Sequence, residues 1–444
     1  MQLTGVLTFG ALVGTAYTAL APIHRRASHH DPYKSLSPIT ATLNSYWFDV
    51  EVEIGNQTFF LVLDTGSSDT WVAATGYTCI DESTNQVVPS DECNWCPTYD
   101  IPSSIDFVHN QTFGVKYGTG IALGRVADAS VTLSGITVPR QRIGIVDRTN
   151  DKGDGINSGI LGLGFPALTS AHPGTELDND TISLITNRAI YYPLFVSMYQ
   201  NDLVEPWYSI AIDRLPRDTA TGKAGWLGLG QLPPVPYSDN WTVTPIEITK
   251  GIPDTFYENG EPEISLMTLT VDSMTWGSSL NSTTTNTTKF QAVVDSGNPQ
   301  NLVPMSAALA INSLFNPPAR FDGNSETFLV ECNAKPPVFG ITINGQTFWH
   351  QPEDMISQDY STGVCYSSVA GSTEGFGFEA NFLGDAFLKN VVAVFDFGRT
   401  EMRFAARTDG SSETGSIPLK SNAPTTYNTA SSIWLLSVLM VLVW

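Results

Sequence analysis

Apolar and polar residues alternate in short runs along most of this chain, and a period of two is typical of β-strands with one buried face. Two such runs, residues 46–55 and 57–63, flank a turn at Gly55-Asn56. Two more runs, residues 112–117 and 122–135, flank Gly118-Thr119-Gly120 and predict a hairpin with these residues at its tip. Further strands are predicted at residues 226–230, 241–248, 264–276 and 392–396, and a short helix at residues 181–189. The pattern therefore predicts an all-β protein.

Two of the predicted strands end on nearly the same motif, Asp64-Thr65-Gly66 and Asp295-Ser296-Gly297. Each motif is followed further along the chain by two apolar residues and a glycine, Ile160-Leu161-Gly162 in the first half and Phe382-Leu383-Gly384 in the second. One such copy would be an ordinary turn after a strand. Two copies in the same order predict two related β lobes, residues 45–202 and 203–407, which together bring two carboxyl groups into one site.

The pairing of Asp64 with Asp295 indicates acid–base chemistry. Two carboxyl groups in one site cannot both ionise easily, so their pKa values separate. One group then stays protonated while the other is ionised, and the site holds an acid and a base side by side.

Length and charge limit the classes of function. The chain has 444 residues, enough for two domains, and 44 acidic against 22 basic groups give it a formal charge of −22. This charge argues against nucleic acid as a partner. It is compatible with solubility alone, and equally with an acid habitat in which many carboxylates are protonated.

The first 44 residues predict export. Residues 1–21 resemble a signal peptide, with an apolar stretch and small residues that place cleavage after Ala16 or Ala19. Residues 22–44 would form a short pro-segment or N-terminal segment. Arg25-Arg26 is either a processing site within it or a chance dibasic pair.

The other end of the chain predicts a glycolipid (GPI) anchor. Residues 433–444 are apolar, but a helix of 12 residues spans only about 18 Å of a hydrocarbon core about 30 Å thick. A polar spacer precedes this tail, with the small residues Ser421 and Asn422 as candidate attachment sites. Residues 408–432 then form a Ser/Thr-rich stalk, and the tail is removed on anchoring. The alternative is a short tail that associates with membranes directly.

Cysteines and glycosylation motifs also fit a secreted protein. Of the five cysteines, Cys332 and Cys365 are expected to pair, while Cys79 pairs with Cys93 or Cys96, and Cys93 is favoured. No second Cys-x-x-Cys or His pair accompanies Cys93 and Cys96, so we expect no metal site. Six Asn-x-Ser/Thr motifs are candidate glycosylation sites: Asn56, Asn110, Asn179, Asn240, Asn281 and Asn286.

Several separated motifs resemble those of the pepsin-like aspartic endopeptidases, across nearly all of the expected mature chain. They are Asp64-Thr65-Gly66-Ser67-Ser68 with Trp71, Tyr117-Gly118-Thr119-Gly120, Ile160-Leu161-Gly162-Leu163-Gly164, Asp295-Ser296-Gly297, and Phe382-Leu383-Gly384-Asp385. With the two end signals added, the chain looks most like the fungal GPI-anchored, yapsin-like branch. The resemblance implies a bilobal pepsin-like fold with a cleft between the lobes.

The resemblance also implies an activity and a set of roles. Asp64 and Asp295, each followed by a glycine at Gly66 or Gly297, would share a water and one proton and cleave polypeptides at acid pH without a cofactor. The resemblance implies supporting roles by position. Ser67 would donate a hydrogen bond to Asp64, and Tyr117 would be the tyrosine of the mobile hairpin, or flap, with Trp71 as its hydrogen-bond partner. Gly118 and Thr119 would contact the substrate backbone, and Ile160 would be either a pocket or a core residue.

Two departures from the family motifs affect the expected site. Asn298-Pro299 stands where the family usually has Ser or Thr, although the amide of Asn298 still offers groups that can hold Asp295. Thr119 stands where some relatives carry an acid, so we expect an apolar preference on both sides of the cleaved bond.

The leading hypothesis is therefore a monomeric endopeptidase that travels through the secretory pathway to the plasma membrane or cell wall. The alternative is a catalytically inactive pepsin-fold protein that binds or inhibits a partner.

Overall fold

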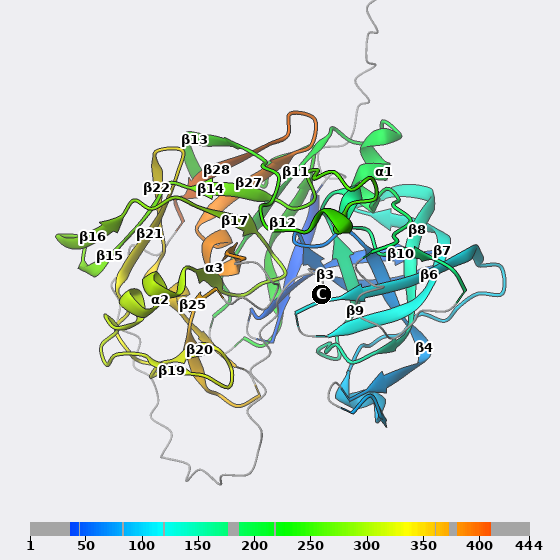
Figure 1. The fold of residues 1–444 in the computed structure, drawn as a ribbon, viewed down its shortest axis with the longest axis horizontal. Coiled ribbons are helices and arrows are strands. Elements are labelled where there is room, and N and C mark those ends of the chain that lie inside the picture. Colours follow the sequence, from blue (N-terminus) through cyan, green and yellow to red (C-terminus); the bar gives the residue numbers. More distant parts are fainter. Residues whose placement is uncertain are drawn as a thin grey trace, which may run out of the picture. The chain divides into compact units, whose positions relative to one another are not determined.

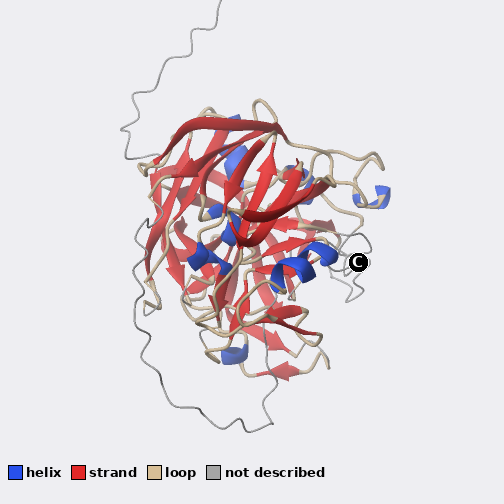
Figure 2. Cartoon of the chain, turned by 90° about the vertical axis from the view of Figure 1, so that its left-hand side faces the viewer, coloured by secondary structure: helices blue, strands red, loops and turns tan. Residues whose placement is uncertain are grey.

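The computed structural model describes residues 36–409 apart from 44, 82–83, 119, 176–185, 217–218, 360 and 373–379. Strands make up most of the secondary structure of this part, and its helices are short (Figure 2). The all-β class predicted from the alternating pattern is therefore confirmed. No helix within these residues is long and apolar enough to cross a membrane.

The largest sheet of the described residues joins strands from both halves of the chain (Figure 1). In spatial order they are β10 (Ala171–Pro173), β6 (Asp106–Lys116), β7 (Ile121–Leu133), β8 (Ile136–Thr149), β4 (Thr70–Ile80), β9 (Asn157–Gly162), β3 (Gln57–Asp64), β2 (Trp47–Ile54), β1 (Leu36–Thr42), β12 (Gly222–Leu229), β11 (Trp207–Ile212), β27 (Val391–Asp396), β28 (Glu401–Arg407) and β13 (Tyr237–Pro245), with β5 (Val87–Val88) paired to β4.

The remaining strands form three smaller sheets. The first contains β14 (Thr268–Val271), β17 (Phe290–Val294), β26 (Phe382–Leu383), β18 (Asn301–Val303) and β25 (Val369–Gly371). The second contains β16 (Ser282–Asn286), β15 (Ser273–Ser279), β21 (Val338–Ile343) and β22 (Gln346–Trp349). The third contains β19 (Arg320–Asp322), β20 (Thr327–Leu329), β24 (Cys365–Ser367) and β23 (Ile356–Gln358).

The helices of the described part are brief. They are α1 (Leu194–Gln200), α2 (Met305–Asn312) and α3 (Asp385–Leu388), together with the 3-10 turns Ser90–Glu92, Pro166–Leu168, Asp254–Phe256 and Pro352–Met355. Both α1 and α2 start directly after a proline, Pro193 and Pro304, which cannot donate a backbone hydrogen bond and suits the start of a helix. Residues 186–189 of the predicted helix are not helical, and residues 181–185 lie outside the described residues.

Strand β2 shows how the sequence pattern becomes structure. Its second half alternates, with Val52 and Ile54 buried and Glu51 and Glu53 exposed. Its first half is buried on both faces, because β1 and β3 flank it in the sheet and the core covers it. The strand therefore carries one acid, Asp49, into the interior.

Strand β1 links the two predicted lobes. It pairs with β2 on one side and with β12, from the second half of the chain, on the other. Residues 36–42 lie in the segment expected to be a short N-terminal or pro-segment. Processing after Arg26 would leave this strand in place, whereas loss of β1 would remove the connection between β2 and β12. The predicted lobe boundary after residue 202 stays a prediction.

One predicted strand, residues 264–276, is divided in the structure. Strand β14 pairs with β17, whereas β15 pairs with β16 and β21 in a different sheet. Asp272 lies between them and its backbone N–H bonds Thr342. The chain therefore changes sheets within a continuous apolar run, which the alternation cannot show.

Candidate active site

The two Asp motifs lie at equivalent places in the fold. Strand β3 ends at Asp64 and runs parallel to β9, where Leu63 stands opposite Leu161. Strand β17 leads into Asp295 and runs parallel to β26, where Val294 stands opposite Leu383. In each half the apolar-apolar-Gly step thus lies beside the strand that presents the Asp.

Four hydrogen bonds tie the two motifs together through Thr65 and Ser296, which are 231 positions apart. The Thr65 hydroxyl donates to the Val294 carbonyl at 2.8 Å, and the Ser296 hydroxyl donates to the Leu63 carbonyl at 2.7 Å. Each hydroxyl also accepts the backbone N–H of the other residue, at 3.0 and 3.1 Å. These buried contacts hold the two strand ends against each other.

The carboxyl groups of Asp64 and Asp295 meet between the two glycines. Each Oδ1 accepts the backbone N–H two residues on, at 2.8 Å from Gly66 and 2.9 Å from Gly297. A Cβ at Gly66 would lie 2.6 Å from Asp295 Oδ1, and one at Gly297 would lie 2.7 Å from Asp64 Oδ1. Only glycine therefore fits at either position, and each carboxyl group lies beside the glycine of the other motif.

Burial raises the pKa values of both acids. Burial raises the pKa of Asp64, and hydrogen bonds from the Ser67 hydroxyl at 2.5 Å and from Gly66 oppose that rise. The pKa of Asp295 is raised well above its ordinary value by burial and then by the charge of Asp64. The two acids titrate as a pair, since the ionisation of each depends on the charge of the other. The pair is thus arranged to hold a single proton in acid.

Asn298 does not take the place that Ser67 has beside Asp64. Its side-chain oxygen accepts the backbone N–H of Gln300 at 3.1 Å, and its Nδ2 has no hydrogen-bond partner among the described residues. Its carbonyl accepts the N–H of Asp385 at 2.8 Å. The sequence suggested that this amide can hold Asp295, but the structure directs it to the turn that follows.

Tyr117 and Trp71 lie on one side of the pair. Tyr117 follows strand β6, and its hydroxyl accepts the indole N–H of Trp71 at 2.6 Å. Both side chains are buried, and the pKa of Tyr117 is raised by burial and by the charges of Asp69 and Asp64. The predicted hairpin is formed by β6 and β7, with Gly118 exposed near its tip, while Thr119 lies outside the described residues.

Ile160 packs inside the structure. It stands opposite Trp71 in the pairing of β9 with β4, is 5% exposed, and belongs to the same apolar cluster as Trp71 and Tyr117. Its core role is therefore evident.

Two further buried acids were not recognised from the sequence. Asp385 begins α3, its pKa is raised well above the ordinary value by burial, and its charge raises the pKa of Asp295 in turn. Asp69 accepts hydrogen bonds from Ser170 and from the Tyr191 hydroxyl, and burial raises its pKa. A comparison of the two repeats offers a signal for Asp385, because the equivalent residue of the first copy is the apolar Leu163.

The structure describes the cysteines and most of the candidate glycosylation sites. The structure contains the disulfides Cys79–Cys93 and Cys332–Cys365, and Cys96 is unpaired and exposed. Four candidate glycosylation sites are exposed and Asn286 is half-buried, while Asn179 lies outside the described residues. The exposed four are Asn56, Asn110, Asn240 and Asn281. The signal segment, Ser421, Asn422 and the tail also lie outside the described residues.

Comparisons with known proteins agree with this geometry. A family model described as eukaryotic aspartyl protease matches residues 45–407. A "Probable aspartic-type endopeptidase" of Aspergillus fumigatus is 36% identical over 370 residues, with 81% of this chain and 78% of the relative covered. Rhizopuspepsin of Rhizopus chinensis is 27% identical, with 82% and 81% covered. A crystal structure of an aspartic proteinase from Irpex lacteus matches with a TM-score of 0.63 at 22% identity, covering 85% of this chain and 98% of that one, and supports the fold.

Proposed function

Since the chain belongs to the eukaryotic aspartyl protease family and is an aspartic-type endopeptidase, we propose that it cleaves peptide bonds at acid pH with a water held between Asp64 and Asp295. The observation that carries this proposal is that each carboxyl group lies beside the glycine of the other motif and accepts its own backbone N–H. Burial raises both pKa values, which matches a site that works while it holds one proton.

Each carboxyl group has a defined part in the proposed reaction. Ionised Asp64 takes a proton from the water, whose oxygen attacks the carbonyl carbon of the scissile bond. Protonated Asp295 donates to the carbonyl oxygen, which becomes a hydroxyl of the tetrahedral intermediate. The proton on Asp64 then passes to the leaving nitrogen, the C–N bond breaks, and Asp295 regains its proton from the hydroxyl as the carbonyl reforms. Proton transfers of this kind contribute about 10²- to 10⁴-fold in rate.

A catalytically inactive pepsin-fold binding protein is the second candidate. The observation that favours it is Asn298-Pro299, which leaves Asp295 without the side-chain donor that Asp64 receives from Ser67. Both carboxyl groups and Tyr117 are nevertheless in contact with their partners, and this supports the enzyme.

Cleavage of denatured protein in acid separates the two candidates. We expect the wild type to cleave it, with inhibition by a statine-type compound, and expect Asp64→Asn and Asp295→Asn each to lose at least about 10²-fold in rate because neither variant can hold one proton on two acids. Glu51→Gln, an exposed acid on β2, is the matched control and should cleave like the wild type. Equal rates in all four proteins would remove the two acids from the reaction, and no cleavage by any would favour the binding protein.

We also propose that the enzyme is secreted, glycosylated and held at the cell surface by a GPI anchor at Ser421 or Asn422, as in the yapsin-like branch. The support is the sequence alone: an apolar start, a polar spacer, and an apolar tail too short to span a bilayer. Its substrates would be unfolded polypeptides with apolar residues at the cut, since position 119 offers no carboxylate.

A further inference from the structure

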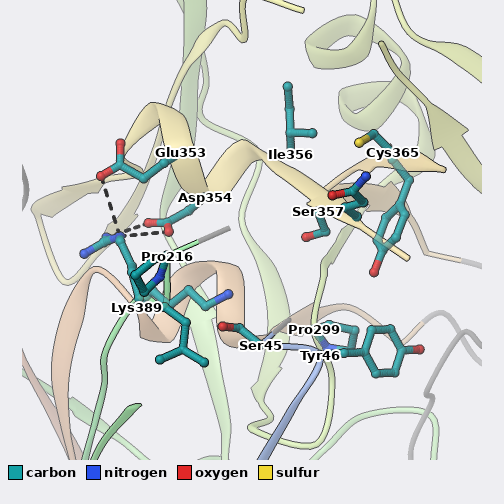
Figure 3. A pocket seen from close by; sticks show the side chains of 14 residues that line it. Ser45, Tyr46, Pro216, Pro299, Glu353, Asp354, Ile356, Ser357, Cys365 and Lys389 are labelled. Carbon is teal, nitrogen blue, oxygen red and sulfur yellow. Dashed lines mark hydrogen bonds and ion pairs between the residues drawn. The ribbon is translucent and has the colours of Figure 1, made fainter. Parts of the chain in front are cut away.

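A pocket with a cation in its wall includes Pro299, which follows Asp295 by four residues. It encloses about 130 Å³ and is lined by Ser45 and Tyr46 before β2, by Pro299, by Ser357 of β23, and by Lys389 after α3 (Figure 3). In Figure 3 the side chain of Lys389 extends into this space, with Glu353 and Asp354 on the same side of the pocket. Arg214 also lines the pocket.

Two short connections join the pocket to the catalytic pair. Pro299 is four residues after Asp295, so their Cα atoms are at most about 14 Å apart. On the other side Lys389 is one helical turn after the buried Asp385, and its N–H bonds the Asp385 carbonyl at 2.9 Å. An extended peptide advances about 3.4 Å per residue, so a substrate lying across the pair reaches the pocket three or four residues from the cleaved bond.

The two cations of the pocket are bound very differently. Arg214 donates to both oxygens of Asp354, at 2.9 and 2.6 Å, and lies 3.9 Å from Glu353, so its charge is matched within the protein. Lys389 is half-buried, and its described interactions are the attraction of Asp385 and the ring of Phe48 at 5.4 Å. No carboxylate of the described residues lies at salt-bridge distance from it.

The rest of the pocket wall holds Arg214 with its two carboxylate partners, Glu353 and Asp354, and several neutral groups. Ser45 and Ser357 contribute hydroxyl groups, and that of Ser357 shares a hydrogen bond with the Ser368 hydroxyl at 2.8 Å. Hydroxyl groups can donate to a carboxylate, and an ammonium group without a close counter-ion attracts one. Lys389 is therefore the group of this pocket that can attract a small anionic side chain, since Arg214 is already paired with Asp354 and Glu353.

We propose that this pocket binds the side-chain carboxylate of an Asp or Glu of the substrate, three or four residues from the cleaved bond, through Lys389. The inference rests on the proposed function and extends it: apolar residues at the cut are combined with an acid at a distance. A partly exposed ion pair contributes up to about fivefold in an equilibrium or rate constant, and we expect a preference of this size.

The test compares paired peptides that differ only in Glu or Gln, placed in turn at the second to fifth position on each side of the cut. At pH 5.5 we expect kcat/KM to be about fivefold higher for the Glu peptide at one position. At pH 3 the ratio should approach one, because Glu has an ordinary pKa near 4.3 and loses its charge. The ratio at a given pH cancels the pH dependence of the catalytic pair itself.

Substitutions assign the effect to Lys389. Lys389→Met should bring the ratio to about one, and Lys389→Glu should reverse it in favour of Gln. Lys335→Met removes an exposed lysine outside the pocket and should leave the ratio unchanged. These ratios do not depend on the overall activity of each variant, which can change because Lys389 also acts on Asp385.

Three results would overturn the inference. One is equal kcat/KM for Glu and Gln at every position of the wild type, a result that requires no variant to fold. Another is a preference that persists in Lys389→Met. The third is a preference for Glu that is spread over many positions and weakened by salt, which would indicate the electrostatic field of the whole protein and not a single pocket. If neither the Glu nor the Gln peptides are cleaved, the proposed function itself fails and the inference fails with it.

Discussion

Ser67 and Asn298 hold equivalent positions in the two Asp motifs but act differently. Ser67 donates to Asp64 at 2.5 Å and favours its ionised form, whereas Asn298 bonds Gln300 and leaves Asp295 with the donor of Gly297. Burial and the charge of Asp64 then raise the pKa of Asp295 further than that of Asp64. The two acids therefore differ in their side-chain donors, and Ser67 stabilises the ionised form of Asp64 alone.

Asn298→Ser should shift the alkaline limit of activity toward acid. A hydroxyl that donates to Asp295 stabilises its ionised form and lowers its pKa, so the pair loses its one proton at a lower pH. We expect the alkaline limb of the kcat/KM profile to move down by about one pH unit, since a hydrogen bond to a charged group contributes about 1.5–3 kcal/mol at most. Asn298→Ala, which adds no donor, is the control, and the same shift in both variants would contradict this role.

Strand β2 shows the cost of an acid inside an element. Asp49 stands opposite Thr40 of β1 and Val62 of β3, is fully buried, and accepts the Thr42 hydroxyl at 3.2 Å. Burial, and then the charge of Asp154, raise its pKa well above the ordinary value. In the unfolded chain the same group ionises near pH 3.9. Folding therefore keeps a proton that the unfolded chain releases as pH rises.

Because of this difference in proton binding, Asp49 favours the folded state more in acid than at neutral pH. Above about pH 4 the unfolded state binds fewer protons at this position, so its contribution to folding is lost as pH rises toward the folded-state pKa. We expect Asp49→Asn to gain stability over the wild type between pH 4 and pH 8, by on the order of 1 kcal/mol, in denaturant titrations. Glu51→Gln, exposed on the same strand, should show no such trend.

The titration of buried histidines does not affect the comparison of Asp49→Asn with the wild type. Burial lowers the pKa of His350 to about 3, so its contribution to stability is lost as pH falls below about 6.5. This effect is present in the wild type and in Asp49→Asn alike. A difference between them that stays constant from pH 4 to pH 8 would therefore exclude Asp49 as the cause.

In the molecule as a whole, one sheet connects the two halves of the chain. Strand β1 lies between β2 and β12, and the bonds of Thr65 and Ser296 add a second connection at the catalytic pair. Neither half holds the site alone, because each carboxyl group is packed against a glycine of the other motif. Separately expressed halves would lack the site for this reason.

The anchor proposal also concerns the whole chain. We expect a phosphatidylinositol-specific phospholipase to release acid protease activity from membranes of cells that express the full sequence, because the lipid would be the only attachment after tail removal. A chain ending at residue 409 should appear in the medium without treatment. Retention of the full chain after treatment, with the tail still detectable by mass, would indicate direct membrane association instead.

The local alternation of apolar and polar residues was enough to predict part of this structure. Alternation predicted β2, β3 and β7 to within a few residues, because a strand with one buried face repeats every two positions. For β6 the predicted strand starts six residues too late, at residue 112 in place of 106. Alternation did not predict the division of residues 264–276 between β14 and β15, or the helices α1 and α2. These depend on which neighbour each segment packs against.

The sequence by itself determined the β class, the two Asp motifs and the order in which they recur, since these follow from residue type and spacing. Only the tertiary structure decided that Asn298 turns away from Asp295, that Asp385 and Asp69 are buried near the pair, and that Lys389 has no carboxylate of the described residues within reach. The reason is physical: a pKa or a hydrogen bond depends on burial and on partners far away in the chain, such as Thr65 and Ser296, and these come together only on folding.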